Sequence, residues 1–213
     1  MNHILLYGGG LDSTALLGYL VGDPRIDRKE LELIHVNYGQ KAAAPEIEAM
    51  IWFATQIDPD IKTTMLTADV SFSNASILRG NGIGETPEDN VLELRNLVLI
   101  SLAASYASTK YFGGEVTLYL GFHREPENSP FLDAQPEYLE HLSSSIRLAS
   151  NLKFFTISTP FINSTRQQIL QLGWSLLGEN FLNMSHTCYE ETTCGVCVHC
   201  KTKEEMVDNL RRY

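Results

Sequence analysis

The 213-residue chain has few basic residues and no long apolar run. Lysine and arginine together number 16, against 26 aspartates and glutamates, so the formal net charge is −10. A broad nucleic-acid-binding face needs clustered Lys and Arg, so this balance argues against nucleic acid and favours small-molecule or protein partners. No stretch is long enough to cross a bilayer, and the N-terminus shows no charged segment followed by a cleavage site. We therefore expect a cytoplasmic protein without a membrane partner.

Cysteine is also scarce, and its distribution is uneven. The chain has four cysteines with the spacing C-x5-C-x2-C-x2-C, namely Cys188, Cys194, Cys197 and Cys200. Disulfides are rare in cytoplasmic proteins, whereas four closely spaced thiolates match a closed tetrahedral zinc site. We expect all four to bind structural Zn²⁺, with reduced thiols or a redox C-x-x-C pair as the alternatives. His199 lies inside the cluster, and we expect it to be exposed to solvent rather than bound to the metal.

The overall composition predicts one ordinary globular domain. Apolar residues make up 44% of the chain and charged residues 20%. We expect a single domain over residues 1–213 that includes a zinc-binding segment at 185–213. Short apolar, β-branched runs predict buried strands at His3–Tyr7, Leu31–Asn37, Lys62–Leu66, Val116–Gly121 and Phe154–Ser158. Helical patterns lie between them, so the sequence predicts an α/β fold with a doubly wound, five-stranded parallel sheet.

Four segments show the spacing of helices. One should run from Ala15 to Val21, and the others should begin near Pro45, Leu94 and Pro136. The residues expected on the apolar faces of the last three are Ile47, Met50, Ile51, Ala54 and Ile57; Leu94, Leu97, Val98, Leu102 and Ser105; and Leu139, Leu142, Ile146 and Ala149. Two connections, 69–91 and 122–135, are too long for plain turns. Each is either a lid or binding loop, or a disordered surface insertion.

The run Gly8-Gly9-Gly10-Leu11-Asp12-Ser13-Thr14 is the most informative stretch of the chain. It follows a predicted strand and precedes a predicted helix, so it aims unpaired backbone N–H groups and a helix dipole at one point. Glycine lets a phosphate lie against the backbone. We expect Asp12 or Ser13 to cap the helix, and the Ser13 and Thr14 hydroxyls to add donors. The run is thus either a phosphate-binding loop or a tight, capped turn.

The spacing within this run narrows the choice of ligand. It has neither the G-x-x-x-x-G-K-[ST] nor the G-x-G-x-x-G pattern, so a Walker-type or dinucleotide site is not expected. A G-G-x-D-S run after the first strand resembles instead the PP-loop of ATP pyrophosphatases, which split ATP into AMP and pyrophosphate while adenylating an oxygen of their substrate. Those loops begin with serine, and here that position is Gly8.

The rest of the chain extends this likeness. With the PP-loop and the cysteine cluster, it resembles the 7-cyano-7-deazaguanine synthase (QueC) family over nearly its whole length. The matching motifs are Tyr38-Gly39-Gln40, Arg95-Asn96-Leu97-Val98, Gly121, Thr159-Pro160, Ser185-His186-Thr187 and Cys188-Tyr189. The resemblance implies an adenine-nucleotide α-hydrolase-like fold. It also implies an ATP-dependent ligase that converts 7-carboxy-7-deazaguanine and ammonia to an amide and then to a nitrile.

The resemblance further implies roles for individual residues. Catalysis would involve Asp12, Ser13 and Arg166, with Asp12 near Mg²⁺ and Arg166 standing where the family usually has lysine. Residues expected to bind ATP are Tyr7, Gly8, Gly9, Gly10, Leu11, Asp12, Ser13, Thr14, Asn37 and Gln40. Residues expected to bind the deazapurine acid are Arg95, Asn96 and Asp133. Arg166 is also compatible with an exposed helix-surface arginine, Arg95 with a helix N-terminal arginine paired with a neighbouring Glu, and Asp133 with a turn residue.

Several positions depart from the family pattern. Lys41-Ala42 replaces Arg-His, Glu93-Leu94 replaces Pro-Gly, and Ala134-Gln135 replaces Cys-Arg. These changes leave open a diverged enzyme that stops at the amide or joins the acid to another amine, such as one on a protein. A nucleotide-binding module without catalysis is a second alternative. A sulfur-transferring tRNA enzyme would need a spare cysteine and a basic face, which the chain lacks. Members of the family tend to dimerise, so a homodimer is also open.

Overall fold

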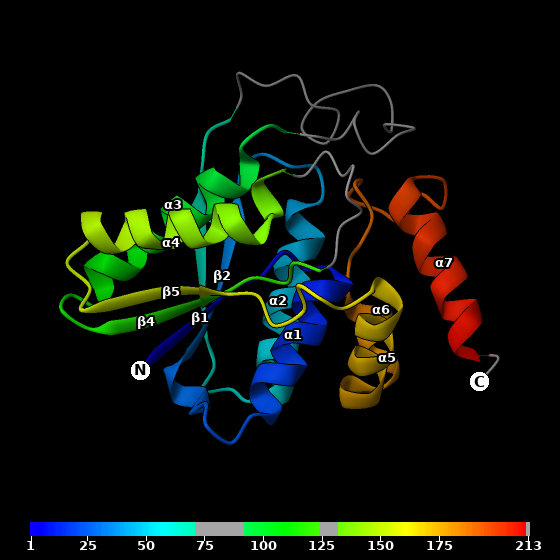
Figure 1. Ribbon diagram of the computed structural model, residues 1–213. Coiled ribbons are helices and arrows are strands. Elements are labelled where there is room, and N and C mark those ends of the chain that lie inside the picture. Colours follow the sequence, from blue (N-terminus) through cyan, green and yellow to red (C-terminus); the bar gives the residue numbers. More distant parts are fainter. Residues whose placement is uncertain (71–91, 124–131, 212–213) are drawn as a thin grey trace.

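The computed structural model describes residues 1–70, 92–123 and 132–211 (Figure 1). Five strands form one parallel sheet in the order β3-β2-β1-β4-β5. They are β1 (Asn2–Leu6), β2 (Leu31–Asn37), β3 (Lys62–Thr67), β4 (Glu115–Tyr119) and β5 (Phe154–Ser158). In the centre of the sheet, His3 pairs with Leu31 on one side and with Thr117 on the other. The five predicted strands are confirmed.

Helices cover both faces of the sheet, as the doubly wound prediction requires (Figure 1). One face carries α1 (Leu11–Gly22), α2 (Ala43–Ile57), α5 (Arg166–Leu177) and α6 (Glu179–Met184), and the other carries α3 (Arg95–Lys110) and α4 (Pro136–Ala149). Successive residues of β1 point to opposite faces, so Leu5 joins the first core and Ile4 the second. The last helix, α7 (Val198–Arg211), lies beside α5 and packs Met206, Val207 and Leu210 against the first core.

The strand order places the change of winding direction between β1 and β4. From β1 the chain moves outward through β2 to β3, then returns to β4 on the other side of β1. In sheets of this kind, ligands bind where the carboxyl ends of these two strands diverge. Gly121 follows β4 at this point, and a Cβ on it would lie 3.1 Å from the Asp12 carbonyl carbon and the Ser13 nitrogen. Glycine at 121 thus lets the start of α1 pack closely on the end of β4.

Three predictions about buried faces are wrong. On α3, Leu94 and Val98 are exposed and the buried side chains include Ala103 and Ala107. Ile100 and Ala104 are buried on the same face, so an isoleucine and three alanines, rather than the larger Leu94 and Val98, pack against the sheet. On α2, Ile51 is likewise half exposed. Strand β3 is not buried on both faces either, because it forms an edge of the sheet.

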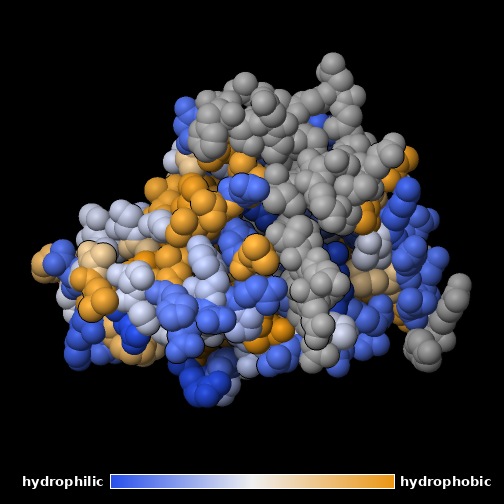
Figure 2. Space-filling view, turned by 45° about the horizontal axis from the view of Figure 1, so that its top comes forward, coloured by the Kyte–Doolittle hydropathy of each residue, from blue (hydrophilic) through white to orange (hydrophobic). Residues whose placement is uncertain are grey.

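The described surface is uneven in character (Figure 2). Apolar side chains gather on the side formed by α3 and α4, where Val98, Phe112 and Leu148 are exposed. Helix α7 is mostly hydrophilic. Across the described ranges, no helix combines the length and the apolar character that a membrane span needs. Two long connections were predicted, at 69–91 and 122–135. Most of each, namely 71–91 and 124–131, lies outside the described residues. The prediction that they form lids or binding loops therefore falls outside the described residues as well.

A buried carboxylate stabilises the end of the sheet opposite to the switch point. Glu32 on β2 is fully buried and accepts hydrogen bonds from Lys110 Nζ at 2.8 Å and from the hydroxyls of Tyr106, Tyr111 and Thr64 at 2.6–2.7 Å. Burial alone would raise the pKa of the Glu32 carboxyl, but these donors, led by Lys110, lower it. Glu32 therefore remains charged when folded, and it stabilises the fold most above its unfolded-state pKa.

Replacing Lys110 with methionine leaves this carboxylate without its cation. We expect Lys110→Met to lower the free energy of unfolding by about 2 kcal/mol at pH 7, since hydrogen bonds to buried charges have this magnitude. The loss should shrink as the pH falls and Glu32 becomes protonated. Urea denaturation at pH 7 and pH 4 measures both values. An equal loss at the two pH values would contradict the network as described.

One non-glycine residue of the described chain has a positive φ. Leu94 caps α3 with φ +57° and ψ +18°, the left-handed conformation. It occupies the position where the family resemblance leads one to expect glycine. Its side chain is 59% exposed, so little burial offsets the strain. The left-handed turn is therefore present with leucine in place of the glycine that would favour it. Arg95, the next residue, begins the first turn of α3.

Restoring glycine at this position should stabilise the protein. We expect Leu94→Gly to raise the free energy of unfolding by about 0.5–1 kcal/mol, because relief of left-handed strain exceeds the entropy that glycine adds to the unfolded chain. Glu93→Gly is the matched control. Glu93 is exposed without a positive φ, so its replacement should destabilise. Urea denaturation compares the two variants, and destabilisation by both would disprove the strain.

Candidate functional site

The glycine run forms the turn between β1 and α1. Gly9 has φ +72°, and Gly10 is the N-cap of α1, which begins at Leu11. The predicted side-chain cap from Asp12 or Ser13 is wrong, because α1 starts earlier than expected and both residues lie within its first turn. Ser13 Oγ instead donates to the Gly10 carbonyl at 3.2 Å. The first-turn N–H groups point out of the helix end, where an anion can accept from them.

Gly9 is confined from two sides. A Cβ on Gly9 would lie 2.6 Å from Cα of Glu46 in the first turn of α2. On the other side, the Gly9 carbonyl accepts a hydrogen bond of 2.9 Å from the N–H of His186. Gly8 differs, since it is exposed and a Cβ there would meet nothing within 4 Å. The loop therefore requires glycine at position 9 but tolerates a side chain at position 8.

Tyr7 and Thr14, two of the residues expected to bind ATP, are buried beneath the glycine loop. The hydroxyls of Tyr7 and Thr14 are 2.7 Å apart and both side chains are buried. The Thr14 N–H donates to the Gly10 carbonyl within α1. Burial raises the pKa of Tyr7, so its phenol stays neutral. Tyr7 and Thr14 thus hold β1 and α1 together, and the donors left for a ligand come from the residues between them.

The turn after β2 brings Asn37 and Gln40 to the same edge of the sheet. Asn37 Oδ1 accepts from the Gly39 N–H at 2.9 Å, which closes the turn. Gln40 is buried, with its oxygen accepting from the Tyr38 N–H at 2.9 Å and its nitrogen donating to Glu46 Oε2 at 2.8 Å. Gln40 therefore lies beside the glycine loop and orients a carboxyl group there.

That carboxyl, on Glu46, has an unusual environment. Burial raises its pKa to about 7, although the hydrogen bond from Gln40 and the nearby charge of Arg95 act in the opposite direction. His35 Nε2 lies 3.8 Å from Glu46 Oε2. The other ring nitrogen, Nδ1, is 3.1 Å from the Tyr7 carbonyl, so it carries the proton. Burial lowers the pKa of His35, and its imidazole is thus neutral.

The three residues expected to bind the acid substrate are brought together at the start of α3. Both oxygens of Asp133 accept from Asn96, one from its N–H and one from its side-chain amide, each at 3.0 Å. The charge of Arg95 acts on the hydroxyl of Tyr38, whose pKa burial raises and the guanidinium lowers. Asp133 thus anchors α3, while Arg95 brings a positive charge to the edge of the sheet near Glu46.

Arg166 lies across the edge from this group, at the first position of α5. A capping box of Thr165 and Gln168 starts the helix there. The Arg166 Nε–H donates to His123 Nε2 at 2.8 Å, just beyond β4. A small cavity of about 30 Å³ opens between the starts of α1 and α5 and the side of α7. The residues lining it include Leu11, Asp12, Arg166, Thr187, His199 and Lys203.

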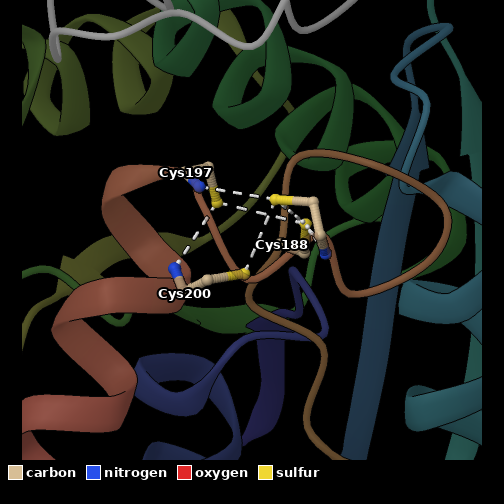
Figure 3. Close-up of side chains that lie close together, drawn as sticks. Cys188, Cys197 and Cys200 are labelled. Carbon is tan, nitrogen blue, oxygen red and sulfur yellow. Dashed lines mark hydrogen bonds between the residues drawn. The ribbon is translucent and has the colours of Figure 1, made fainter.

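The four cysteines converge beside this cavity (Figure 3). Cys188 Sγ is 3.4 Å from Cys194 Sγ and 4.0 Å from Cys197 Sγ, and Cys194 Sγ is 3.9 Å from Cys200 Sγ. Four sulfurs bound tetrahedrally at 2.3 Å to one zinc ion would be about 3.8 Å apart. The arrangement therefore fits a single tetrahedral metal ion.

Backbone donors surround the sulfur atoms. N–H groups of Cys194, Cys197 and Cys200 each point at a sulfur of the cluster at 3.4 Å. For Cys194, burial opposes ionisation, but N–H donors including that of Cys197 lower the pKa to about 7. For Cys200, burial and the neighbouring thiols raise the pKa to about 12. A cation among the sulfurs would relieve this crowding of thiolates.

The cysteine segment is joined directly to the loop. The link to the glycine loop is the His186–Gly9 hydrogen bond. A second link joins the cysteine segment to the turn after β2, where Lys41 Nζ lies 2.7 Å from Glu190 Oε1. Lys203 on α7 donates to the Leu182 carbonyl at 2.7 Å.

The expectation that His199 is solvent-exposed is wrong: its ring packs edge-on against Tyr189 with centroids 4.6 Å apart, and burial lowers its pKa to about 4.

Sequence reasoning assigned no role to three residues of this site: Glu46, His186 and Lys203. Glu46 follows Pro45 in a helical pattern, where an acidic residue is ordinary for a first turn. His186 acts through its backbone, which no side-chain pattern reveals. Lys203 lies in a charged helix that resembles a solvated surface.

Comparisons with known proteins agree with this geometry. The family model described as "Queuosine biosynthesis protein QueC" matches residues 2–210. The 7-cyano-7-deazaguanine synthase of Marinomonas sp. (strain MWYL1) is 29% identical over 211 residues, which cover 95% of this chain and 91% of that protein. The synthase of Clostridium kluyveri is 28% identical over 218 residues, covering 95% and 91%.

A solved structure shares the fold. The U34-tRNA thiolase NcsA from Methanococcus maripaludis, solved with its [4Fe-4S] cluster, superposes with a TM-score of 0.54 and 14% identity, covering 100% of this chain and 67% of that one. At this identity the likeness concerns the fold alone. The family model, in contrast, spans nearly every residue from the glycine loop to the cysteines. The chain therefore belongs to the QueC family.

Proposed function

We propose that this protein is an ATP-dependent ligase that makes 7-cyano-7-deazaguanine. It adenylates the carboxylate of 7-carboxy-7-deazaguanine, joins ammonia to the activated carbon to give an amide, and converts the amide to the nitrile. The observation that carries this proposal is the glycine loop at the switch point of the sheet, with Asp12 and Arg166 in one cavity beside it.

The loop suits an attack at the α-phosphate of ATP. Negative charge grows there as the carboxylate oxygen attacks, and the first-turn N–H groups of α1 are fixed donors that need no rearrangement. Arg166 adds a cation whose orientation is set by His123. Mg²⁺ would neutralise the pyrophosphate, and Asp12 is the carboxylate of this cavity able to approach it.

The substrate acid fits on the opposite side of the loop. Arg95 supplies a planar cation for a carboxylate or phosphate, and the hydroxyl of Tyr38 lies near it. Within the described ranges, each oxygen of Asp133 accepts one hydrogen bond, both from Asn96, and has a second lone pair. It can therefore still accept from the N–H groups of a guanine-like ring while it anchors α3.

The cysteine cluster would hold Zn²⁺ as a structural ion. Its four thiolates leave no open coordination position for chemistry, and the sulfur spacing is that of one ion. A [4Fe-4S] cluster is larger than one ion and needs its cysteine sulfurs farther apart. Reduced, metal-binding cysteines also support a cytoplasmic location. A homodimer stays a prediction, for which the exposed apolar side chains of α3 and α4 offer a surface.

The alternatives can be separated by product. Purified protein would be incubated with ATP, Mg²⁺ and 7-carboxy-7-deazaguanine, with and without ammonia, and AMP and deazapurine products measured by mass spectrometry. The proposal predicts AMP and nitrile. Amide alone, or adducts on co-expressed proteins, would indicate the diverged enzyme. No AMP under any condition would indicate a binding module without catalysis.

Position 8 offers a direct test of the phosphate loop. We expect Gly8→Ser to lower the KM for ATP about fivefold, because the loop has room for the side chain and one added hydrogen bond to phosphate contributes about 1 kcal/mol. Gly8→Ala adds the same Cβ without the hydroxyl and should leave the KM unchanged. Steady-state kinetics measures both, and equal behaviour of the two variants would exclude a hydroxyl contact with ATP.

Metal removal tests the link between the cysteine cluster and the loop. We expect chelation to lower affinity for an ATP analogue at least tenfold, because the His186 N–H that holds Gly9 is two residues from Cys188. Calorimetry on metal-free and reconstituted protein measures the change. Added zinc should restore binding at about one ion per chain. Full nucleotide affinity in metal-free protein would contradict the coupling.

A further inference from the structure

One carboxyl group lies between the nucleotide loop and the proposed substrate residues. Glu46 is in the first turn of α2, and its N–H donates to the Ala42 carbonyl at 3.0 Å. Its Cα, Cβ and Cγ would all lie within 2.9 Å of a Cβ placed on Gly9. The stem of Glu46 thus rests on the loop where the α-phosphate would bind, and its carboxyl faces Gln40 and His35.

The carboxyl is held in one orientation. Gln40 Nε2 donates to Oε2 at 2.8 Å, while the other end of the Gln40 amide accepts from the Tyr38 N–H. The Glu46 side chain remains 18% exposed, so the group is both fixed and reachable. A fixed, partly accessible carboxyl next to a reacting centre has the geometry of a general base.

The charges facing Glu46 leave it able to exchange a proton near neutral pH. From β2 it faces neutral His35, from the following turn Gln40 and the hydroxyl of Tyr38, and from α3 the cation of Arg95. Burial outweighs the cation and raises the pKa of Glu46 to about 7. Above this pH the group is a carboxylate, and as a base it is stronger than an ordinary glutamate.

Neighbouring acidic residues are committed elsewhere. Asp133 accepts two hydrogen bonds from Asn96, and Glu190 pairs with Lys41 at 2.7 Å. Each of these two carboxylates joins one element of the fold to another. Among the residues that the structure describes, Glu46 accepts a hydrogen bond from the Gln40 amide and forms no salt bridge to a lysine.

We propose that Glu46 accepts the proton from nitrogen in the amide-forming step, an inference that rests on the proposed function. The ammonia lone pair attacks the acyl carbon of the adenylate and a C–N bond forms. One N–H proton passes to the Glu46 carboxylate. The C–O bond to the phosphate then breaks, AMP leaves with its electron pair, and Glu46 returns the proton to water.

The test separates this step from adenylation. Acid-dependent exchange of pyrophosphate into ATP reports adenylation, and amide formation is followed at constant free-ammonia concentration. We expect Glu46→Gln to keep exchange within about threefold of wild type and to slow amide formation about 100-fold. The wild-type amide rate should rise with pH through about 7, and this rise should vanish in the variant.

Two further variants control for structure. Glu48→Gln removes an exposed carboxyl from the same helix and should leave both rates and the pH profile unchanged. Glu46→Asp retains a carboxyl and should keep the pH dependence at an intermediate rate. Both remain informative if Glu46→Gln fails to fold.

Three results would overturn the inference. Equal loss of exchange and amide formation in the Glu46 variants would mean that the residue only supports the loop. A wild-type amide rate and pH profile in Glu46→Gln would mean that it accepts no proton. Absence of exchange in the wild type would remove the proposed function itself, and the inference with it.

Discussion

The confinement of Gly9 is the constraint on which the rest of the site depends. Its positive φ turns the chain from β1 into α1, and the backbone of Glu46 leaves no room for a side chain there. The His186 N–H holds its carbonyl from the other side. Segments from the start, the first third and the end of the chain therefore meet at one residue. Through it, the cysteine cluster and α2 both determine how the loop presents its N–H groups.

Two carboxyl groups associated with β2 show how environment separates structural from chemical roles. Glu32, at the start of the strand, is surrounded by Lys110 and three hydroxyls, and its pKa lies below the ordinary value. Glu46, near the strand's end, has the amide of Gln40, and its pKa lies above the ordinary value. The first stays charged and stabilises the sheet. The second lies at the edge where ligands bind in sheets of this kind, and it changes its charge near neutral pH.

Local patterns predicted the sheet, the glycine turn and the cysteine cluster, because each is encoded within a few neighbouring residues. The failures have physical causes. The buried face of α3 includes three alanines such as Ala103 beside Ile100, and hydropathy ranks alanine below the exposed Leu94. Asp12 does not cap α1, since the helix begins before it. Contacts such as that of His186 with Gly9 join distant segments through the backbone, and one sequence carries no local signal for them.

The central proposal is that the backbone N–H groups between Gly9 and Ser13 receive the α-phosphate of ATP. A crystal structure with a non-hydrolysable ATP analogue tests it most directly. The account predicts α-phosphate oxygens within hydrogen-bonding distance of the N–H groups at the start of α1, with Arg166 close to the phosphates. A nucleotide bound elsewhere, with this loop empty, would contradict it.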